Sequence, residues 1–129
     1  MRIAEVAKQF DISADTLRYY ERIGLLRPVQ RNANGVRDYS EEDCARIGFV
    51  KCMRGANVSI EALIEYMRLF DEGDATLEAR KQILIEQRDA ARERLARVQA
   101  GLDRLDYKIA HYDELISLQK AAITEGRAS

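Results

Sequence analysis

Two cysteines and one histidine are the residues of this chain best suited to covalent or metal chemistry, and they are few. Cys44 and Cys52 are separated by eight positions on one expected helix, about 12 Å along its axis, which is too far for a disulfide bond. His111 is the only histidine, so no Ser/Cys–His–acid triad is plausible. No glycine-rich phosphate loop or cluster of metal ligands accompanies them. We therefore expect no enzyme activity, no metal site and no cofactor.

Cys52 has the more suggestive surroundings of the two thiols. Lys51 precedes it and Arg54 follows two residues later, and positive neighbours favour the reactive thiolate. Its expected place at a helix C-terminus acts in the opposite direction, because the helix dipole is negative there. A cysteine can also pack as a small apolar residue. The residues alone leave both interpretations open, a sensing thiol and a packing one, whereas Cys44 is expected in the core beside Ile47.

Arginine, threonine and tyrosine side chains form a second group with chemical potential, because they can bind nucleic acid. Arginine pairs with guanine in a bidentate manner, and threonine and tyrosine contact bases or phosphates. The candidate DNA-binding residues are Thr16, Arg18, Tyr19, Arg22, Arg31, Arg37 and Tyr39. The alternative is that they are ordinary solvated side chains, with the tyrosines partly in the core. The elements that carry them decide between these interpretations.

The first four of these residues lie on the second of two short expected helices. Apolar residues at i, i+3, i+4 and i+7 predict a helix over residues 3–10. Ser13 is a suitable N-cap for a helix that begins near Ala14, and Gly24 is a suitable stop. Leu17 and Tyr20 give this helix an inner side. Two short helices joined by three residues constitute a helix-turn-helix, whose second helix reads DNA in the major groove.

The remaining candidates fall in a segment of different character, residues 27–39. It contains Asn34-Gly35 between two short, partly β-branched stretches, which is a hairpin signal because both residues tolerate positive φ. This pattern predicts a small β-wing. After it, Ser40 and Ser59 are N-cap residues for a third helix to about Arg54 and a fourth to about residue 69.

The C-terminal part of the chain predicts a coiled coil. Apolar residues recur in steps that alternate between four and three from residue 91 to residue 116, which is a heptad seam surrounded by charged residues. Such a helix cannot bury its own seam, so a second copy is expected to cover it. The predicted dimerisation residues are Leu84, Ala91, Leu95, Val98, Leu102, Leu105, Ile109 and Tyr112.

Several sequence runs resemble the MerR family of transcription regulators over nearly the whole chain. The runs are Ile3-Ala4-Glu5-Val6-Ala7, Thr16-Leu17-Arg18-Tyr19-Tyr20-Glu21-Arg22-Ile23-Gly24-Leu25-Leu26 and Arg37-Asp38-Tyr39. The resemblance implies that Arg18 and Tyr19 bind in the major groove or on its phosphates, and that Arg37 and Tyr39 contact the DNA backbone from the wing. It further implies a dimer that distorts an overlong promoter so that RNA polymerase can use it, by the energetic logic of indirect readout.

Within the family, the stretch around Cys52 is similar to the AdhR/NmlR-like branch. That resemblance implies a response to aldehydes or other electrophiles, with Cys52 as the sensor. The family's metal sensors have cysteines at the end of the long helix and after it, and this chain has none there. Two alternatives remain: a MerR-type regulator with a reversible small-molecule effector, and a coiled-coil interaction protein that does not bind DNA.

The expected fold class is mostly α, a winged helix-turn-helix followed by a long coiled-coil dimerisation helix. The expected division is a DNA-binding domain over residues 1–70, a linker over 71–76, an antiparallel coiled-coil helix over 77–120 and a C-terminal tail over 121–129. The longest apolar runs are too short to span a membrane, and the N-terminus lacks the apolar core of a signal peptide. We therefore expect a cytoplasmic protein whose partners are double-stranded promoter DNA, RNA polymerase and a second copy.

Overall fold

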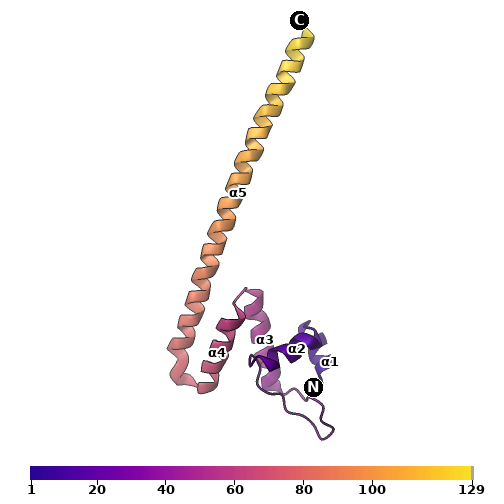
Figure 1. The fold of residues 1–129 in the computed structure, drawn as a ribbon, viewed down its shortest axis with the longest axis vertical. Helices are drawn as coiled ribbons and strands as arrows, with labels where there is room; N and C mark the ends of the chain where they lie inside the picture. The colour runs from indigo at the N-terminus through magenta and orange to yellow at the C-terminus, as the bar shows by residue number, and fades with distance from the viewer. Residues whose placement is uncertain (129) are drawn as a thin grey trace. The chain divides into compact units, whose positions relative to one another are not determined.

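The computed structural model describes residues 1–128, with side chains through residue 126, and divides into one unit over Met1–Arg88 and a second from Asp89 onward. The elements are α1 (Ile3–Phe10), α2 (Ala14–Arg22), α3 (Glu41–Gly55), α4 (Ile60–Glu72), a 3-10 turn η1 (Asp74–Thr76) and α5 (Leu77–Ala128) (Figure 1). The predicted mostly helical fold class is confirmed. Among the described residues no helix is both long and apolar enough to cross a lipid bilayer.

Serine side chains set where three of these helices begin, as the sequence predicts. The Ser13 hydroxyl accepts a hydrogen bond from the Thr16 amide at 3.0 Å. Ser40 forms a complete capping box, since its hydroxyl accepts from the Asp43 amide and the Asp43 carboxylate accepts from the Ser40 amide. Ser59 accepts from the amide of residue 62. Each bond satisfies an amide that the helix itself leaves unpaired.

Two connected apolar clusters form the core of the first unit. One joins the helix-turn-helix to α3 and the wing; its buried members are Val6, Leu17, Leu26, Val29, Tyr39 and Ile47. The other joins the end of α2 to α3 and α4; its buried members are Leu25, Val50, Val58, Leu63 and Met67. Tyr20 packs against both clusters. The angle of α2 is therefore fixed from two sides, which matters because α2 carries the candidate reading residues.

The wing is a loop between α2 and α3 and not the β-hairpin that the sequence predicts. Its extended arms make one isolated antiparallel bridge, between Arg31 and Arg37. The tip is a turn closed by a hydrogen bond from the Gly35 amide to the Asn32 carbonyl at 2.9 Å. Only Gly35 of the predicted turn pair has positive φ, at 76°. The Asn32 side-chain oxygen accepts from the amides of residues 34 and 36, so one side chain replaces the missing strand ladder.

A shared carboxylate joins the start of the wing segment to α3 and α4. Asp71, at the end of α4, accepts from Arg27 at 2.7 Å and from Arg46 of α3. Burial tends to raise the pKa of this carboxyl, but the hydrogen bonds from Arg46 and Arg27 outweigh that effect, and the pKa lies below its usual value. The two guanidiniums thus hold Asp71 ionised and tie three segments together.

The corner between α4 and α5 is ordered, which corrects the expectation of a plain linker over residues 71–76. Residues 71 and 72 still belong to α4, and residues 74–76 form η1. Arg80 is the buried charged residue of this corner. Its guanidinium donates to the Thr76 hydroxyl at 3.1 Å and to the Gly73 carbonyl at 3.3 Å, and it lies 5.3 Å from the centre of the Phe70 ring.

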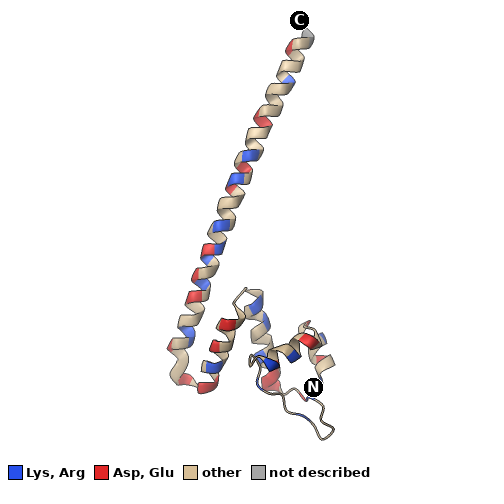
Figure 2. Ribbon diagram, in the orientation of Figure 1, with Lys and Arg blue, Asp and Glu red and all other residues tan. Residues whose placement is uncertain are grey.

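Helix α5 continues well beyond its predicted end at residue 120. It runs from Leu77 to Ala128, so residues 121–128 of the expected tail are helical, and residue 129 lies outside the described residues. Nothing between positions 120 and 125 stops a helix, since Ala121 and Ala122 are strong helix formers. Figure 2 shows basic positions (blue) and acidic positions (red) interspersed along the ribbon of this helix.

Candidate nucleic-acid interface

Helix α2 presents three basic or aromatic side chains to solvent. Leu17 is fully buried, whereas Arg18, Tyr19 and Arg22 are exposed. Arg18 forms an exposed ion pair with Asp15 at 3.0 Å. Arg22 lies over the Tyr19 ring, 5.4 Å from its centre, a cation–π geometry. The structure thus brings these predicted residues onto one helix as hydrogen-bond donors that face water.

Thr16 lies in the first turn of α2, where its hydroxyl accepts from the Ser13 hydroxyl at 2.8 Å. This bond fixes the threonine side chain next to the amides at the start of α2. The N-terminal turn of a helix carries a partial positive charge and favours anions such as phosphates. Thr16 is half-buried, so its hydroxyl is less accessible than the side chains of the following turn.

Arg37 joins the wing to α2. Its Nε donates to Glu21 Oε1 of α2 at 2.9 Å, and both side chains are largely buried, 23% and 19% exposed. Arg31 bonds instead within the wing, where Nη1 donates to the Gly35 carbonyl at 2.7 Å. Because Arg37 is held in an ion pair, it contributes to the interface by positioning the wing more than by offering a free charge.

Tyr39 corrects the sequence prediction, because it is a core residue and not a surface contact. Its side chain is 3% exposed and packs in the first cluster. Burial raises the pKa of its hydroxyl. That hydroxyl has no hydrogen-bond partner among the described residues. The sequence suggested exposure because Tyr39 stands beside charged residues in a polar segment, but the chain turns inward there to start α3.

Two basic residues that the sequence reasoning used only as neighbours of Cys52 lie beside the start of α2. Lys51 and Arg54, on the last turns of α3, line a surface hollow together with Ser13 and Thr16. Lys51 Nζ donates to the Phe10 carbonyl, and Arg54 Nη1 donates to the Val58 carbonyl at 2.7 Å. Their i, i+3 spacing near the end of the predicted third helix could have indicated this location, since it places both basic side chains on one face of the helix.

The two cysteines differ in accessibility. Cys52 is exposed on α3, whereas Cys44 is half-buried and packs against the first cluster. Burial raises the pKa of the Cys44 thiol, which disfavours its reactive thiolate. The expected inward position of Cys44 is confirmed, whereas the sensing role of Cys52 stays a prediction for an exposed thiol. In the described part of the chain, no three His, Cys, Asp or Glu side chains gather in a way that could hold a metal ion.

The predicted seam of α5 is apolar and accessible in the single chain. Leu84, Leu95, Val98, Leu102, Leu105, Ile109 and Tyr112 are exposed, and Ala91 is half-buried. Leu115 and Ile116 are exposed as well. Exposed apolar side chains in a regular heptad pattern are typical of a helix that pairs with another helix.

Comparison with known proteins decides the family. The model of the MerR helix-turn-helix family of regulatory proteins matches residues 1–69, which cover α1, α2, the wing, α3 and most of α4. The chain belongs to the MerR family. The AdhR transcriptional regulator of Bacillus subtilis is 64% identical over 88 residues, which are 68% of this chain and 63% of AdhR. The alignment thus spans less than two thirds of that relative.

Solved structures of MerR-family regulators extend the similarity to the long helix. A regulator from Listeria monocytogenes has 50% identity and a TM-score of 0.81, over 93% of this chain and 92% of its own. HiNmlR, described as a MerR family regulator lacking the sensor domain and solved bound to promoter DNA, has 29% identity and a TM-score of 0.69, over 88% and 90% of the two chains.

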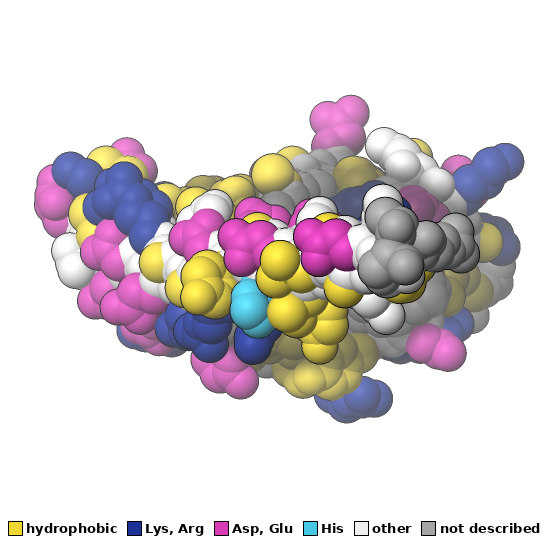
Figure 3. All heavy atoms as spheres, turned by 90° about the horizontal axis from the view of Figure 1, so that it is seen from above, with side chains coloured by type: hydrophobic (Ala, Val, Ile, Leu, Met, Phe, Trp, Pro, Cys, Tyr) yellow, Lys and Arg dark blue, Asp and Glu magenta, His cyan; other side chains and the backbone are white. Residues whose placement is uncertain are grey.

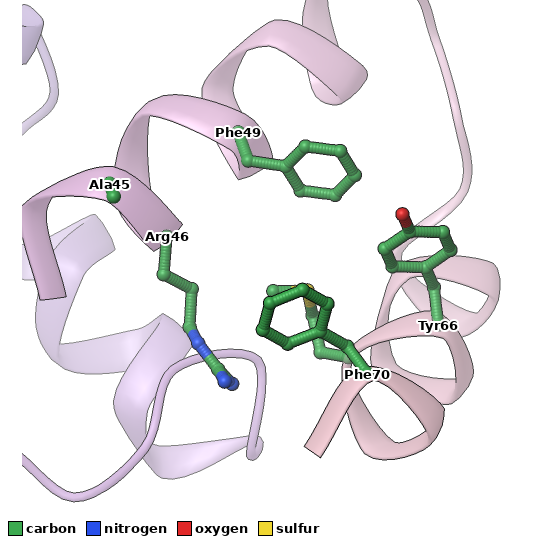
Figure 4. Close-up of a pocket in the computed structure, with 6 residues that line it drawn as sticks. Ala45, Arg46, Phe49, Tyr66 and Phe70 are labelled. Carbon is green, nitrogen blue, oxygen red and sulfur yellow. The ribbon is translucent and has the colours of Figure 1, made fainter. Parts of the chain in front are cut away.

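This MerR-family chain also carries a small apolar pocket between α3 and α4. Its lining residues are Ala45, Arg46, Phe49, Tyr66, Met67 and Phe70 (Figure 4). The rings of Phe49 and Tyr66 stack with centres 5.1 Å apart. The pocket volume is about 170 Å³, below the roughly 300–1,000 Å³ typical of drug-sized ligands. It fits a small apolar molecule or a single side chain.

Proposed function

We propose that the chain is a homodimeric transcription regulator that binds promoter DNA through α2 and the wing. The observation that carries this proposal is the exposed set Arg18, Tyr19 and Arg22 on a helix whose opposite side is buried. The Arg37–Glu21 ion pair holds the wing at a set position beside that helix. A reading helix and a wing in fixed relation contact base edges and neighbouring phosphates together.

Arg18 is the residue most suited to sequence readout. Arg18 forms an exposed ion pair with Asp15, in which both side chains remain largely accessible. Exposed pairs of this kind contribute little and are readily exchanged. Arg18 can therefore leave Asp15 for a guanine edge or a phosphate at little cost. HiNmlR was solved bound to promoter DNA, which supports DNA binding by this chain.

The dimer follows from the exposed seam of α5. Two copies bring two reading helices to one duplex, and the operator should then consist of two inverted half-sites. In the mechanism that the family resemblance implies, the dimer bends and untwists its promoter, and RNA polymerase recognises the distorted form. Such a regulator would act in the cytoplasm.

The DNA-binding proposal is tested with Arg18→Ala, and Arg97→Ala on the outer side of α5 is the matched control. A bidentate arginine–base contact contributes about 1–3 kcal/mol, so Arg18→Ala should weaken operator binding at least about tenfold, because two copies act per dimer. Arg97→Ala should leave affinity unchanged. Fluorescence anisotropy against salt concentration gives both values. If both variants bind operator DNA with equal affinity, Arg18 does not contribute to the DNA interface.

For the effector we propose an aldehyde or a related electrophile that reacts with Cys52. The exposed thiol adds to the aldehyde carbonyl, a sulfur–carbon bond forms, and the thiol proton moves to the carbonyl oxygen to give a hemithioacetal. This step needs no oxidant. Cys52 is exposed while Cys44 is half-buried, so the chain contains its own comparison between an accessible and a shielded thiol.

The test compares Cys52→Ser and Cys44→Ser with the unchanged protein in transcription from its own promoter, with and without methylglyoxal. The proposal predicts that Cys52→Ser alone abolishes induction. In parallel, iodoacetamide labelling followed by mass spectrometry should modify Cys52 at least tenfold faster than Cys44. Normal induction of Cys52→Ser would refute a thiol sensor.

That refuting result would favour a reversible ligand, and the pocket between α3 and α4 is the observation that supports this second candidate. Phe49, Tyr66 and Phe70 supply aromatic surface, and Arg46 supplies a charged group at its edge. Phe49→Ala should then weaken the response to that ligand while Cys52→Ser does not.

A further inference from the structure

The tip of the wing carries a reactive residue pair whose side chain the turn itself does not use. The sequence Asn34-Gly35 predicts a hairpin turn in which both residues have positive φ, but of the two only Gly35 has it, at 76°. The amides of residues 34 and 36 donate to the side-chain oxygen of Asn32. Asn34 is exposed, and its own side-chain amide has no hydrogen-bond partner among the described residues. This side-chain amide is therefore free to react.

We propose that Asn34 is a site of spontaneous deamidation, and that the negative charge formed there weakens operator binding as the protein ages. The Gly35 nitrogen attacks the side-chain carbonyl carbon of Asn34, and the new carbon–nitrogen bond closes a five-membered imide ring. The bond from that carbon to Nδ2 breaks, and ammonia leaves with the proton that Gly35 gives up through water. Water then opens the ring to aspartate or isoaspartate. The consequence for DNA rests on the proposed function, whereas the reaction itself needs only solvent.

Glycine at position 35 is the residue type that allows this attack. It has no side chain to crowd the nitrogen or to restrict the rotation that brings the nitrogen to the Asn34 side chain. The surrounding space is open as well, because a methyl group on Gly35 would contact nothing within 4 Å. Since the positive φ also requires glycine here, the backbone of the wing itself keeps the reactive pair in place.

One hydrogen bond must open before the ring can close. The Gly35 amide donates to the Asn32 carbonyl at 2.9 Å, at an exposed tip with a single antiparallel bridge behind it, between Arg31 and Arg37. Backbone bonds that are exposed and have few buried contacts around them open at a low free energy. The attacking nitrogen is therefore released far more often in the wing than it would be in a core helix.

The chain contains two further asparagines that serve as internal comparisons. Asn32 precedes Ala33, and its side chain is held by the two amide bonds described above. Asn57 precedes Val58, a buried β-branched residue whose amide is hydrogen-bonded in the turn between α3 and α4. At both positions the following side chain crowds the attacking nitrogen, and existing bonds hold one of the reacting groups. Deamidation should therefore be confined to Asn34.

A negative charge at position 34 would stand in neutral surroundings. Figure 3 shows acidic side chains at several places on the face seen from above, where one more would change little. Residues 32–36 contain no charged side chain, and the neighbouring Arg31 donates to the Gly35 carbonyl at 2.7 Å. A carboxylate at position 34 would repel DNA phosphates and compete for that guanidinium. Isoaspartate would in addition insert a methylene group into the backbone directly before Gly35.

The size of the effect follows from the charge. In water, a unit negative charge about 7 Å from a phosphate lowers affinity about threefold, so the two wings of a dimer together cost roughly sevenfold. Dissolved salt screens such a repulsion. The loss of affinity should therefore shrink as the salt concentration is raised.

Ageing of the purified protein tests the modification. Wild type and Asn34→Gln are incubated at mildly alkaline pH, peptide mass spectrometry measures deamidation at each asparagine, and an isoaspartyl methyltransferase reports isoaspartate. We expect the product at Asn34 well before Asn32 or Asn57, and far less at position 34 of the variant, because glutamine would have to close a less favourable six-membered ring. Earlier reaction at Asn32 or Asn57 would overturn the assignment. So would an unmodified Asn34 under conditions in which a synthetic peptide of residues 30–38 deamidates.

The consequence for DNA is measured with fresh Asn34→Asp, which carries the product charge from the start. Fluorescence anisotropy at low salt should show operator binding roughly sevenfold weaker than that of wild type. Aged wild type should approach this level in proportion to the fraction deamidated, while aged Asn34→Gln keeps its affinity. Unchanged affinity of Asn34→Asp would refute the effect of the charge. If fresh wild type binds no operator, the proposed function fails and this consequence with it, whereas the mass measurement still decides whether Asn34 is modified.

Discussion

Removal of one oxygen atom, in Tyr39→Phe, tests the inward position of this residue. The hydroxyl is buried, and no described residue bonds to it. An unpaired buried polar group costs about 1–3 kcal/mol of desolvation. Phenylalanine has nearly the same shape and keeps the packing against the first cluster, so the substitution removes the cost and leaves the contacts.

We therefore expect Tyr39→Phe to raise the free energy of unfolding by about 1 kcal/mol, and the melting temperature by roughly 2–5 °C for a chain of this size. Urea unfolding followed by circular dichroism measures the change, at one fixed protein concentration because dimerisation adds to apparent stability. Tyr39→Ala is the matched control, and loss of the ring should cost about 3–5 kcal/mol.

The same variant separates the core role from a DNA contact. If the ring only packs, Tyr39→Phe binds operator DNA with unchanged affinity. A loss of 1 kcal/mol or more in stability would mean that the hydroxyl is hydrogen-bonded in the folded protein, and a tenfold loss of DNA affinity would mean that it reaches a phosphate. Either result would refute the reasoning above.

Three further substitutions test other parts of the fold. Asp71→Asn should lower the free energy of unfolding at neutral pH by about 1–2 kcal/mol, because Arg46 and Arg27 lose a charged partner. The pKa of Asp71 is depressed in the folded protein, so its stabilising contribution is present above its unfolded pKa and disappears as pH falls through the folded pKa. The urea midpoint of the variant should therefore depend less on pH in acid than that of the wild type. Gly24→Ala should cost about 1 kcal/mol, because φ is +83° while the added methyl would contact nothing within 4 Å; a stabilised variant would contradict this. Ser40→Ala should cost about 1 kcal/mol through loss of the capping box, and an unchanged urea midpoint would contradict this role.

Local signals in the sequence were sufficient for the helices of the first unit. Serine caps at residues 13, 40 and 59 and the glycine at position 24 act within a few residues of themselves, so their effects are readable without tertiary information. Leu17 followed from helical periodicity for the same reason. The fold class and the family were therefore accessible from the sequence.

Tertiary effects account for what the sequence did not predict. The direction of Tyr39 depends on where the chain turns into α3, and the wing's single bridge depends on the Asn32 side chain, which satisfies amides that a strand would otherwise pair. The Arg37–Glu21 contact joins residues 16 positions apart, so no local pattern indicates that this arginine is already paired. The end of α5 was missed because Ala121 and Ala122 favour a helix, which therefore continues past residue 120.

The sparse bonding of the wing has a thermal consequence. Its tip is held by the Asn32 side chain, the Arg31–Gly35 hydrogen bond, one turn and a single bridge, and the Arg37–Glu21 ion pair ties the wing to α2. No sheet lies behind it among the described residues, whereas α2 and α3 are anchored in the core. Segments with few buried contacts open at a lower free energy than the whole domain. On warming, the wing should therefore loosen before the helices melt. The affinity of the protein for DNA should fall over a temperature range in which the protein is still folded, and it should recover on cooling.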